Sequence, residues 1–248
     1  MNAPAKSEGI VAYKAFNKDF ACTGGDKPFQ YEVGKTYTHE GPVKSCEAGF
    51  HACENPLDVL NFYPLIDDHG NLCRFGRVTL SGKIDRSDSK KCAAGTIAIE
   101  VELSLPEWVS TAVKWLANSC KGSDAGVASG DYSQLAASGD YSKLAASGCS
   151  SQLAASGYSS KLAASGDSSQ LAASGDYSKL ELTGSFSAAA AVGVGSRIKA
   201  GPGCPIAICE YSKDGKPLRF VTGIAGQDGV PADVWLEARN GKFVEVSA

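Results

Sequence analysis

The sequence of 248 residues lacks several features that would place it in a common functional class. No apolar run approaches the ~20 residues that a membrane-spanning helix needs, and the first residues contain no hydrophobic stretch typical of a secretory signal. The formal net charge of −3 gives no electrostatic argument for binding nucleic acid or an anionic membrane. We therefore expect a cytoplasmic protein that uses no membrane and no nucleic acid as a direct ligand.

The sequence also lacks a recognisable catalytic or metal site. It shows no convincing combination of nucleophile, general base and phosphate-binding loop, so no catalytic residue and no cofactor is predicted. The nine cysteines are expected to be reduced thiols, because no secretory signal accompanies them. Cys46 and Cys53 flank His51, but their spacing fits no common zinc pattern, and no metal site is predicted. Cys204 and Cys209 are expected in the core.

What the sequence does contain is an internal repeat. Between Ser129 and Leu182 a unit of nine residues recurs six times: SGDYSQLAA, SGDYSKLAA, SGCSSQLAA, SGYSSKLAA, SGDSSQLAA and SGDYSKLEL. Self-similarity at a fixed period indicates a solenoid. The Ser-Gly pair predicts a turn, because glycine supplies backbone freedom and the neighbouring Ser and Asp are turn formers. The residues between turns predict one short strand in each unit.

The residue before each repeat leucine predicts the size of a coil. This residue alternates strictly between glutamine and lysine, in the order Gln134, Lys143, Gln152, Lys161, Gln170, Lys179. The true period is then eighteen, which predicts a two-sided parallel β-solenoid with rungs ~4.8 Å apart. The glutamines should stack on one flank and the lysines on the other, with the leucines facing inward. A three-sided coil, or a recent duplication without structural meaning, remains the alternative.

Several ligands of repetitive rods are not favoured here. Calcium-binding nonapeptide rolls carry the signature GGxGxDxUx, whereas these units lack the Gly-Gly pair and only some contain Asp. Ice binding needs rows of Thr, which the units almost lack. The lysine row could bind phosphate, but Asp residues at the neighbouring turns nearly cancel its charge. We expect a scaffold, a spacer or a partner-binding surface formed by Lys143, Lys161, Lys179, Gln134, Gln152, Gln170, Tyr132, Tyr141 and Tyr177.

The chain is expected to divide into four segments of a mainly β protein. Residues 1–104 should form an α+β domain, 105–121 a helix, 122–203 the solenoid and 204–248 a β-meander. In the first segment we expect strands at 10–16, 29–37, 46–52, 73–81 and 96–103. A short helix should start at Pro56, with Asn55 as its N-cap.

Two further elements are expected to close the ends of the solenoid. Ser104 and Glu107 form a capping box, and the apolar helix that follows them should cover the open first coil, whose strand edge would otherwise invite aggregation. The meander, with strands at 205–211, 218–224, 234–237 and 243–246, should close the other end.

Two blocks of the sequence resemble a family of uncharacterised proteins common in phages and prophages. They are AYKAFNKDFAC…FQYEVGKTY…CEAGFHACENPLDVLNFYP at 12–64 and TGIAGQDGVPADVWLEARNGKFVEV at 222–246. The resemblance implies a phage or mobile-element origin and a host-cytoplasmic setting, and it brings no catalytic assignment. It favours a non-catalytic interaction protein whose partner is a host or phage protein complex, with inhibition of a host defence complex as one outcome.

Two other functions remain as alternatives. The solenoid could be a spacer in a virion. The order Tyr-Lys-x-Phe, Gly-Phe-His, helix and Tyr is loosely similar to ADP-ribosyltransferase cores, which implies a transferase that uses Tyr13, Lys14 and His51, although no catalytic Glu can be placed. A homodimer is also compatible with the sequence, because a regular exposed flank pairs readily with its own copy.

Overall fold

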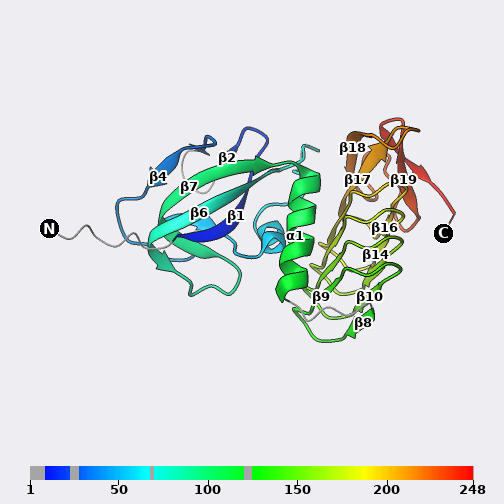
Figure 1. Cartoon of the computed structure of the whole chain (residues 1–248), viewed down its shortest axis with the longest axis horizontal. Helices are drawn as coiled ribbons and strands as arrows, with labels where there is room; N and C mark the ends of the chain where they lie inside the picture. Colours follow the sequence, from blue (N-terminus) through cyan, green and yellow to red (C-terminus); the bar gives the residue numbers. More distant parts are fainter. Residues whose placement is uncertain (1–8, 23–27, 68–69, 120–124, 248) are drawn as a thin grey trace. The chain divides into compact units, whose positions relative to one another are not determined.

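The computed structural model of the chain describes residues 9–22, 28–67, 70–119 and 125–247. The protein is mainly β and divides into two compact units (Figure 1). The first unit comprises residues 1–63 and 73–108, and the second comprises 64–72 and 109–248. No helix in these described ranges is long and apolar enough to cross a membrane.

The first unit is built on an antiparallel sheet in the order β1-β6-β7-β4, with β5 also paired to β7. Its strands are β1 (Ile10–Phe16), β4 (Thr36–Thr38), β5 (Phe50–Ala52), β6 (Arg74–Asp85) and β7 (Cys92–Leu103), while β2 (Ala21–Cys22) and β3 (Phe29–Gln30) form a separate pair. The short 3-10 helix η1 (Pro56–Asn61) starts as predicted, because the side chain of Asn55 accepts a hydrogen bond from the Leu57 backbone.

Two expectations for this unit were wrong in detail. The strand expected over 29–37 is interrupted, since Gly34 adopts a φ of 82° and turns the chain between β3 and β4. The strand expected over 46–52 is confined to β5, because Cys46 has a φ of 67°, outside the β region. On β7, Val101 is 37% exposed, whereas Ile97 and Ile99 are buried. The pairing shifts by one residue at this point, and such a bulge reverses the alternation of faces.

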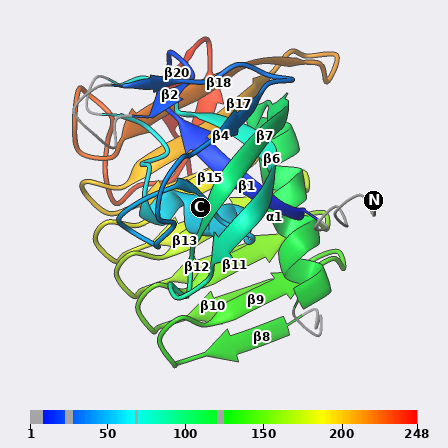
Figure 2. The ribbon, with the colours of Figure 1, turned by 90° about the vertical axis from the view of Figure 1, so that its left-hand side faces the viewer.

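The second unit contains the predicted two-sided solenoid (Figure 2). Its strands alternate between a seven-stranded sheet, in the order β20-β19-β16-β14-β12-β10-β8, and a six-stranded sheet, in the order β18-β17-β15-β13-β11-β9. The coil strands are β8 (Ala125–Ala128), β9 (Gln134–Ala137), β10 (Lys143–Ala146), β11 (Gln152–Ala155), β12 (Lys161–Ala164), β13 (Gln170–Ala173), β14 (Lys179–Leu182), β15 (Ala188–Ala191) and β16 (Arg197–Ala200). Lys143 pairs with Lys161 and Gln152 with Gln170, so one coil has the predicted eighteen residues.

A thin core of leucine and alanine lies between the two sheets. Leu144, Leu153, Leu162, Leu171 and Leu180 are all 3% exposed or less, and burial of each contributes roughly 1.5–3 kcal/mol. The serine that precedes each strand from β10 to β16 is also buried, and from β10 to β14 its hydroxyl donates to the glycine carbonyl of its own turn. In one such turn, the Ser160 hydroxyl donates to the Gly157 carbonyl at 2.9 Å. The alternation predicted from the sequence, with leucine inward and lysine outward, is therefore confirmed.

The turns of the coils differ from expectation in one respect. Positive φ angles fall two residues after the repeat glycine, as at Tyr141 (58°), Ser150 (56°) and Tyr177 (55°). The repeat glycine itself is needed for the close approach of successive coils. A Cβ built on Gly148 would lie 2.1 Å from the Gly130 carbonyl oxygen one coil earlier, a distance that no side chain can occupy.

The meander closes the C-terminal end of the solenoid as predicted. The hairpin of β17 (Pro205–Tyr211) and β18 (Pro217–Ile224) continues the six-stranded sheet, and the hairpin of β19 (Leu236–Arg239) and β20 (Lys242–Glu245) continues the other sheet. Cys204 and Cys209 are buried here, as expected.

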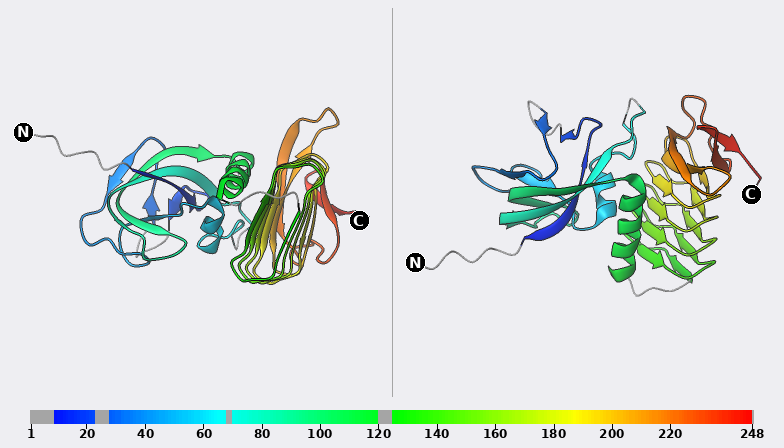
Figure 3. Two further views of the ribbon diagram at one scale, coloured as in Figure 1. Left: turned by 60° about the horizontal axis from the view of Figure 1, so that its bottom comes forward. Right: turned by 45° about the horizontal axis from the view of Figure 1, so that its top comes forward.

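The helix α1 (Leu105–Ser119) does not close the other end. It begins at the predicted capping box, where the Ser104 backbone N–H donates to Glu107 Oε2 at 2.8 Å. Its residues from Val109 onward belong to the second unit, where the helix runs along the side of the coil stack and not across the first coil (Figures 1 and 3). The expectation that α1 covers the first coil was therefore wrong.

Candidate functional site

The predicted lysines form one column on the outer face of the seven-stranded sheet. Lys143, Lys161 and Lys179, which we call the lysine column, occupy the same register position on β10, β12 and β14. Arg197 on β16 extends the column by one rung, because it pairs with Lys179. Sequence reasoning missed Arg197, although it lies eighteen residues after Lys179 and the coil period would have found it.

The two halves of this column differ in how their charge is balanced. Arg197 forms an ion pair with Glu237 at 2.7 Å, and the Lys179 ammonium lies 5.9 Å from the centre of the Trp235 ring. Lys143 and Lys161 are exposed, and neither forms an ion pair with any described residue. Two like charges 4 Å apart repel each other by about 1 kcal/mol in water, so stacking two unpaired lysines is unfavourable for the isolated chain.

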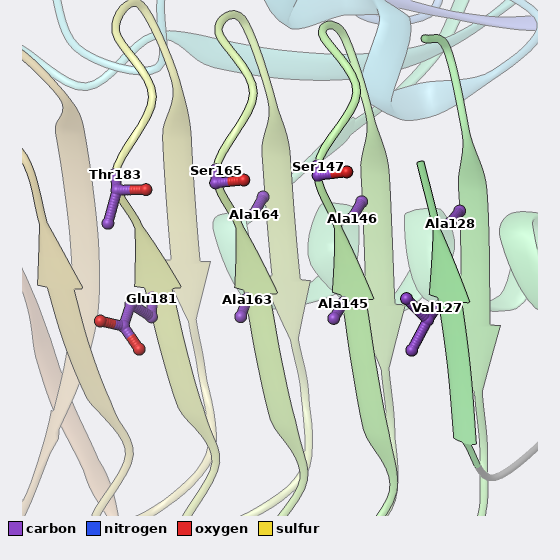
Figure 4. Close-up of a pocket in the computed structure, with 10 residues that line it drawn as sticks. All are labelled: Val127, Ala128, Ala145, Ala146, Ser147, Ala163, Ala164, Ser165, Glu181 and Thr183. Atoms are coloured by element: carbon purple, nitrogen blue, oxygen red, sulfur yellow. The ribbon is translucent and has the colours of Figure 1, made fainter. Parts of the chain in front are cut away.

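A shallow groove of about 300 Å³ runs beside the lysine column (Figure 4). Its floor is formed by Ala145 and Ala163, with Val127 at one end and Glu181 at the other. Its far rim carries hydroxyl groups, contributed by Ser147, Ser165 and Thr183. The small floor residues allow another chain to approach the sheet closely, and the adjoining lysines favour acidic groups on that chain.

Tyrosines cover the turns that lead into the lysine strands. The ring centres of Tyr141 and Tyr158 lie 5.8 Å apart, and those of Tyr158 and Tyr177 lie 5.3 Å apart. All three rings remain 44–66% exposed, which makes them available for contact with a partner. The prediction included Tyr141 and Tyr177 but missed Tyr158, which is displaced by one position within its repeat. The stack ends at Gly195, where a Cβ would lie 2.8 Å from the Tyr177 ring.

The structure separates the predicted glutamines and Tyr132 from this surface. Tyr132 precedes β9, so it lies on the opposite corner of the coil from Tyr141 and Tyr177. Gln134 Nε2 donates to Gln152 Oε1 at 3.1 Å, and Gln152 Nε2 donates to Gln170 Oε1 at 3.0 Å. Gln152 and Gln170 are only 4% and 5% exposed, so the expectation that these two residues belong to a binding surface was wrong. Gln134, at the end of this hydrogen-bond ladder, is exposed.

The repeat aspartates also have a structural role. Asp140 Oδ1 accepts a hydrogen bond from the Tyr158 backbone N–H one coil later, at 2.8 Å. Asp131, Asp167 and Asp176 make the same contact to residues eighteen positions further on. These carboxylates therefore hold successive turns together, which explains their recurrence without a metal ion.

Lys14 and His51, two of the three candidate residues of the first unit, contact each other, and their polar groups already have partners. The Lys14 ammonium donates to the His51 carbonyl at 2.8 Å and lies 5.5 Å from the centre of the Tyr31 ring. His51 Nε2 accepts the Cys46 backbone N–H at 3.1 Å. Burial lowers the pKa of His51, and the charge of Lys14 adds to this effect. Burial likewise raises the pKa of Tyr13. This cluster ties β1 to the segment around β5.

Comparison with known proteins bears on the N-terminal part of the chain. Residues 10–111 match the model of a protein family described as a domain of unknown function (DUF7666). That range ends within α1 and leaves the solenoid outside. No curated protein and no solved structure matches the chain.

Proposed function

We propose that the chain is a non-catalytic interaction protein that binds an acidic segment of a partner protein on the outer face of the seven-stranded sheet. One observation carries this proposal. Lys143 and Lys161 are stacked, exposed and without an acidic partner in the described residues, beside a groove floored by alanine. A partner that supplies carboxylates to the lysines would remove their mutual repulsion and cover the groove at the same time.

The frame that carries these lysines favours binding of this kind. Successive coils are joined by backbone hydrogen bonds, such as Lys161 N–H to Ser142 C=O at 2.8 Å and Ser165 N–H to Ala146 C=O at 3.0 Å. A surface that is already ordered loses little conformational entropy when a partner binds. The exposed tyrosines at the adjacent corner add contact area at a low entropic cost.

The biological setting that we propose rests on the resemblance to phage and prophage proteins. In this proposed setting the chain acts in the cytoplasm of a bacterial host. Its partner there is a host defence or regulatory complex, which the protein inhibits. A role as a virion spacer would instead leave the protein in purified particles. For a transferase, Lys14 and His51 would have to give up the hydrogen bonds that they already make.

The experiment is a tagged capture from host lysate with mass spectrometry. It compares the wild type, the double variant Lys143→Glu/Lys161→Glu, and the charge-matched control Lys213→Glu/Lys242→Glu, whose lysines are exposed in the C-terminal meander. We expect a stoichiometric, salt-sensitive complex with the wild type and the control and its loss in the double variant. A complex that the double variant retains, or the absence of any stoichiometric partner, would contradict the proposal.

A further inference from the structure

The first coil of the solenoid presents an open strand edge. Strand β8 is the last strand of the seven-stranded sheet, and β10 is its sole partner among the described strands. The Ser147 N–H donates to the Ala128 carbonyl at 3.0 Å. Bonded residues alternate along a parallel strand, so Val127 turns its own N–H and C=O toward the open edge. The Val127 side chain is 87% exposed.

The edges at the other end of the solenoid carry features that discourage pairing. Strand β18 begins with Pro217 and exposes Arg219, and β20 contains Lys242 and Glu245. Proline and charged side chains are the usual means by which proteins protect sheet edges. Strand β8 has the sequence AGVA and contains neither. The two ends of the solenoid therefore differ in their capacity to accept another strand.

We propose that the protein forms a homodimer in which the β8 strands of two copies pair antiparallel across a two-fold axis. A strand edge is self-complementary under such an axis, because each donor of one copy meets an acceptor of the other. The pairing would join the two seven-stranded sheets edge to edge. This pairing does not depend on the proposed acidic partner, although Lys143 lies next to both the β8 edge and the groove beside the lysine column.

Charge also favours a second copy as the occupant of this edge. The start of β8 lies beside Lys143, because Ala125 pairs with it, and the end of β8 is followed by the exposed Asp131. Antiparallel pairing brings the Asp131 end of one copy to the Lys143 end of the other. The two-fold axis produces this match of opposite charges twice in each dimer.

Sedimentation velocity of the intact chain at about 1 to 100 µM, compared with edge variants, tests the proposal. Val127→Pro removes the N–H at the open edge, and Val127→Lys places like charges at the two-fold axis without changing the backbone. We expect a dimer for the wild type and for the control Val127→Thr, and at least a ~10-fold weaker association for the other two variants. Thermal unfolding shows whether each variant is folded. If Val127→Pro is not folded, the association of Val127→Lys alone tests the proposal.

Two charge variants separate this interface from a dimer through the lysine column. Asp131→Asn keeps an acceptor for the Cys149 N–H but removes the charge, and it should weaken the dimer and reduce its salt sensitivity. Lys161→Glu, one coil away from the edge, should leave the dimer intact. A wild type that is monomeric throughout the range would overturn the proposal, as would a dimer that survives Val127→Lys or is lost in Lys161→Glu alone.

Discussion

The carbonyl oxygen of Gly139 lies so close to Gly157, one coil later, that a Cβ on Gly157 would be 2.0 Å away from it. The same relationship recurs between Gly148 and Gly166 and between Gly166 and Gly184, at 2.1 and 2.2 Å. The coil-to-coil distance at these corners is therefore set by backbone packed directly on backbone. This requirement, and not a left-handed turn conformation, explains the repeat glycine in the units from Gly148 to Gly193.

We expect Gly157→Ala to destabilise the solenoid by more than about 3 kcal/mol, because the added methyl group must displace backbone. Gly130→Ala is the matched control. Gly130 belongs to the first coil, and its Cβ would have its nearest neighbour at 3.8 Å, the Ser133 hydroxyl. This control should change the free energy of unfolding by less than about 1 kcal/mol. Urea denaturation measures both, and equal effects of the two substitutions would contradict the explanation.

The bond from the Tyr158 N–H to Asp140 predicts a difference between two substitutions at the aspartate. Asp140→Ala should cost about 1 kcal/mol, because it removes the acceptor. Asp140→Asn should retain most of the stability, since its side-chain oxygen can still accept. Thermal unfolding of the two variants provides the comparison. If Asp140→Asn were as destabilising as Asp140→Ala, the charge of the aspartate and not its hydrogen bond would account for its contribution to stability.

The buried glutamine ladder predicts that its members contribute unequally to stability. Gln152→Ala should destabilise the protein by roughly 1–3 kcal/mol, because it leaves the buried amide of Gln170 without its donor. Gln134→Ala, at the exposed end of the ladder, should cost less than half as much. Chemical denaturation measures the two effects. A larger loss for Gln134 would show that Gln152 is not buried in solution.

The lowered pKa of His51 predicts a loss of stability in acid. The folded state favours the neutral imidazole, so the contribution of His51 is present above the unfolded pKa of about 6.5 and is lost as the pH falls through the lower folded value. His51→Gln should retain an acceptor for the Cys46 N–H and remove this titration. The free energies of unfolding of the wild type and of His51→Gln, measured between about pH 8 and 5, should therefore converge as the pH falls. A difference between the two free energies of unfolding that stays constant over this pH range would exclude a contribution from the titration of His51.

The sequence predicted the solenoid well because its information is periodic. Alternation of Gln and Lys ahead of each leucine implies that residue i pairs with residue i+18, and Lys143 opposite Lys161 follows directly. The same period leads to Arg197, once the decayed repeats are counted as coils. Tyr158 was missed because it lies one position off the repeat, and its ring reaches the Tyr141 stack only through the geometry of the turn.

The sequence could not show which outer face of the solenoid is available for binding. Glutamine and lysine are both polar, and the pattern treats their rows alike. In the structure Gln152 and Gln170 are buried and bond to each other, whereas Lys143 and Lys161 are exposed to solvent. Burial of an outer face depends on segments distant in the chain, so no local period encodes it.

The sequence by itself determined the coil length, the inward leucines, the capping box at Ser104 and the hairpins that close the C-terminal end. Each of these depends on neighbouring residues or on a repeated register, where local hydrogen bonds and side-chain alternation decide the outcome. Only the tertiary structure decided the reason for the repeat glycines, the burial of the glutamines and the open edge at Val127. These depend on close contacts, or on their absence, between residues that the chain brings together from different coils or different segments.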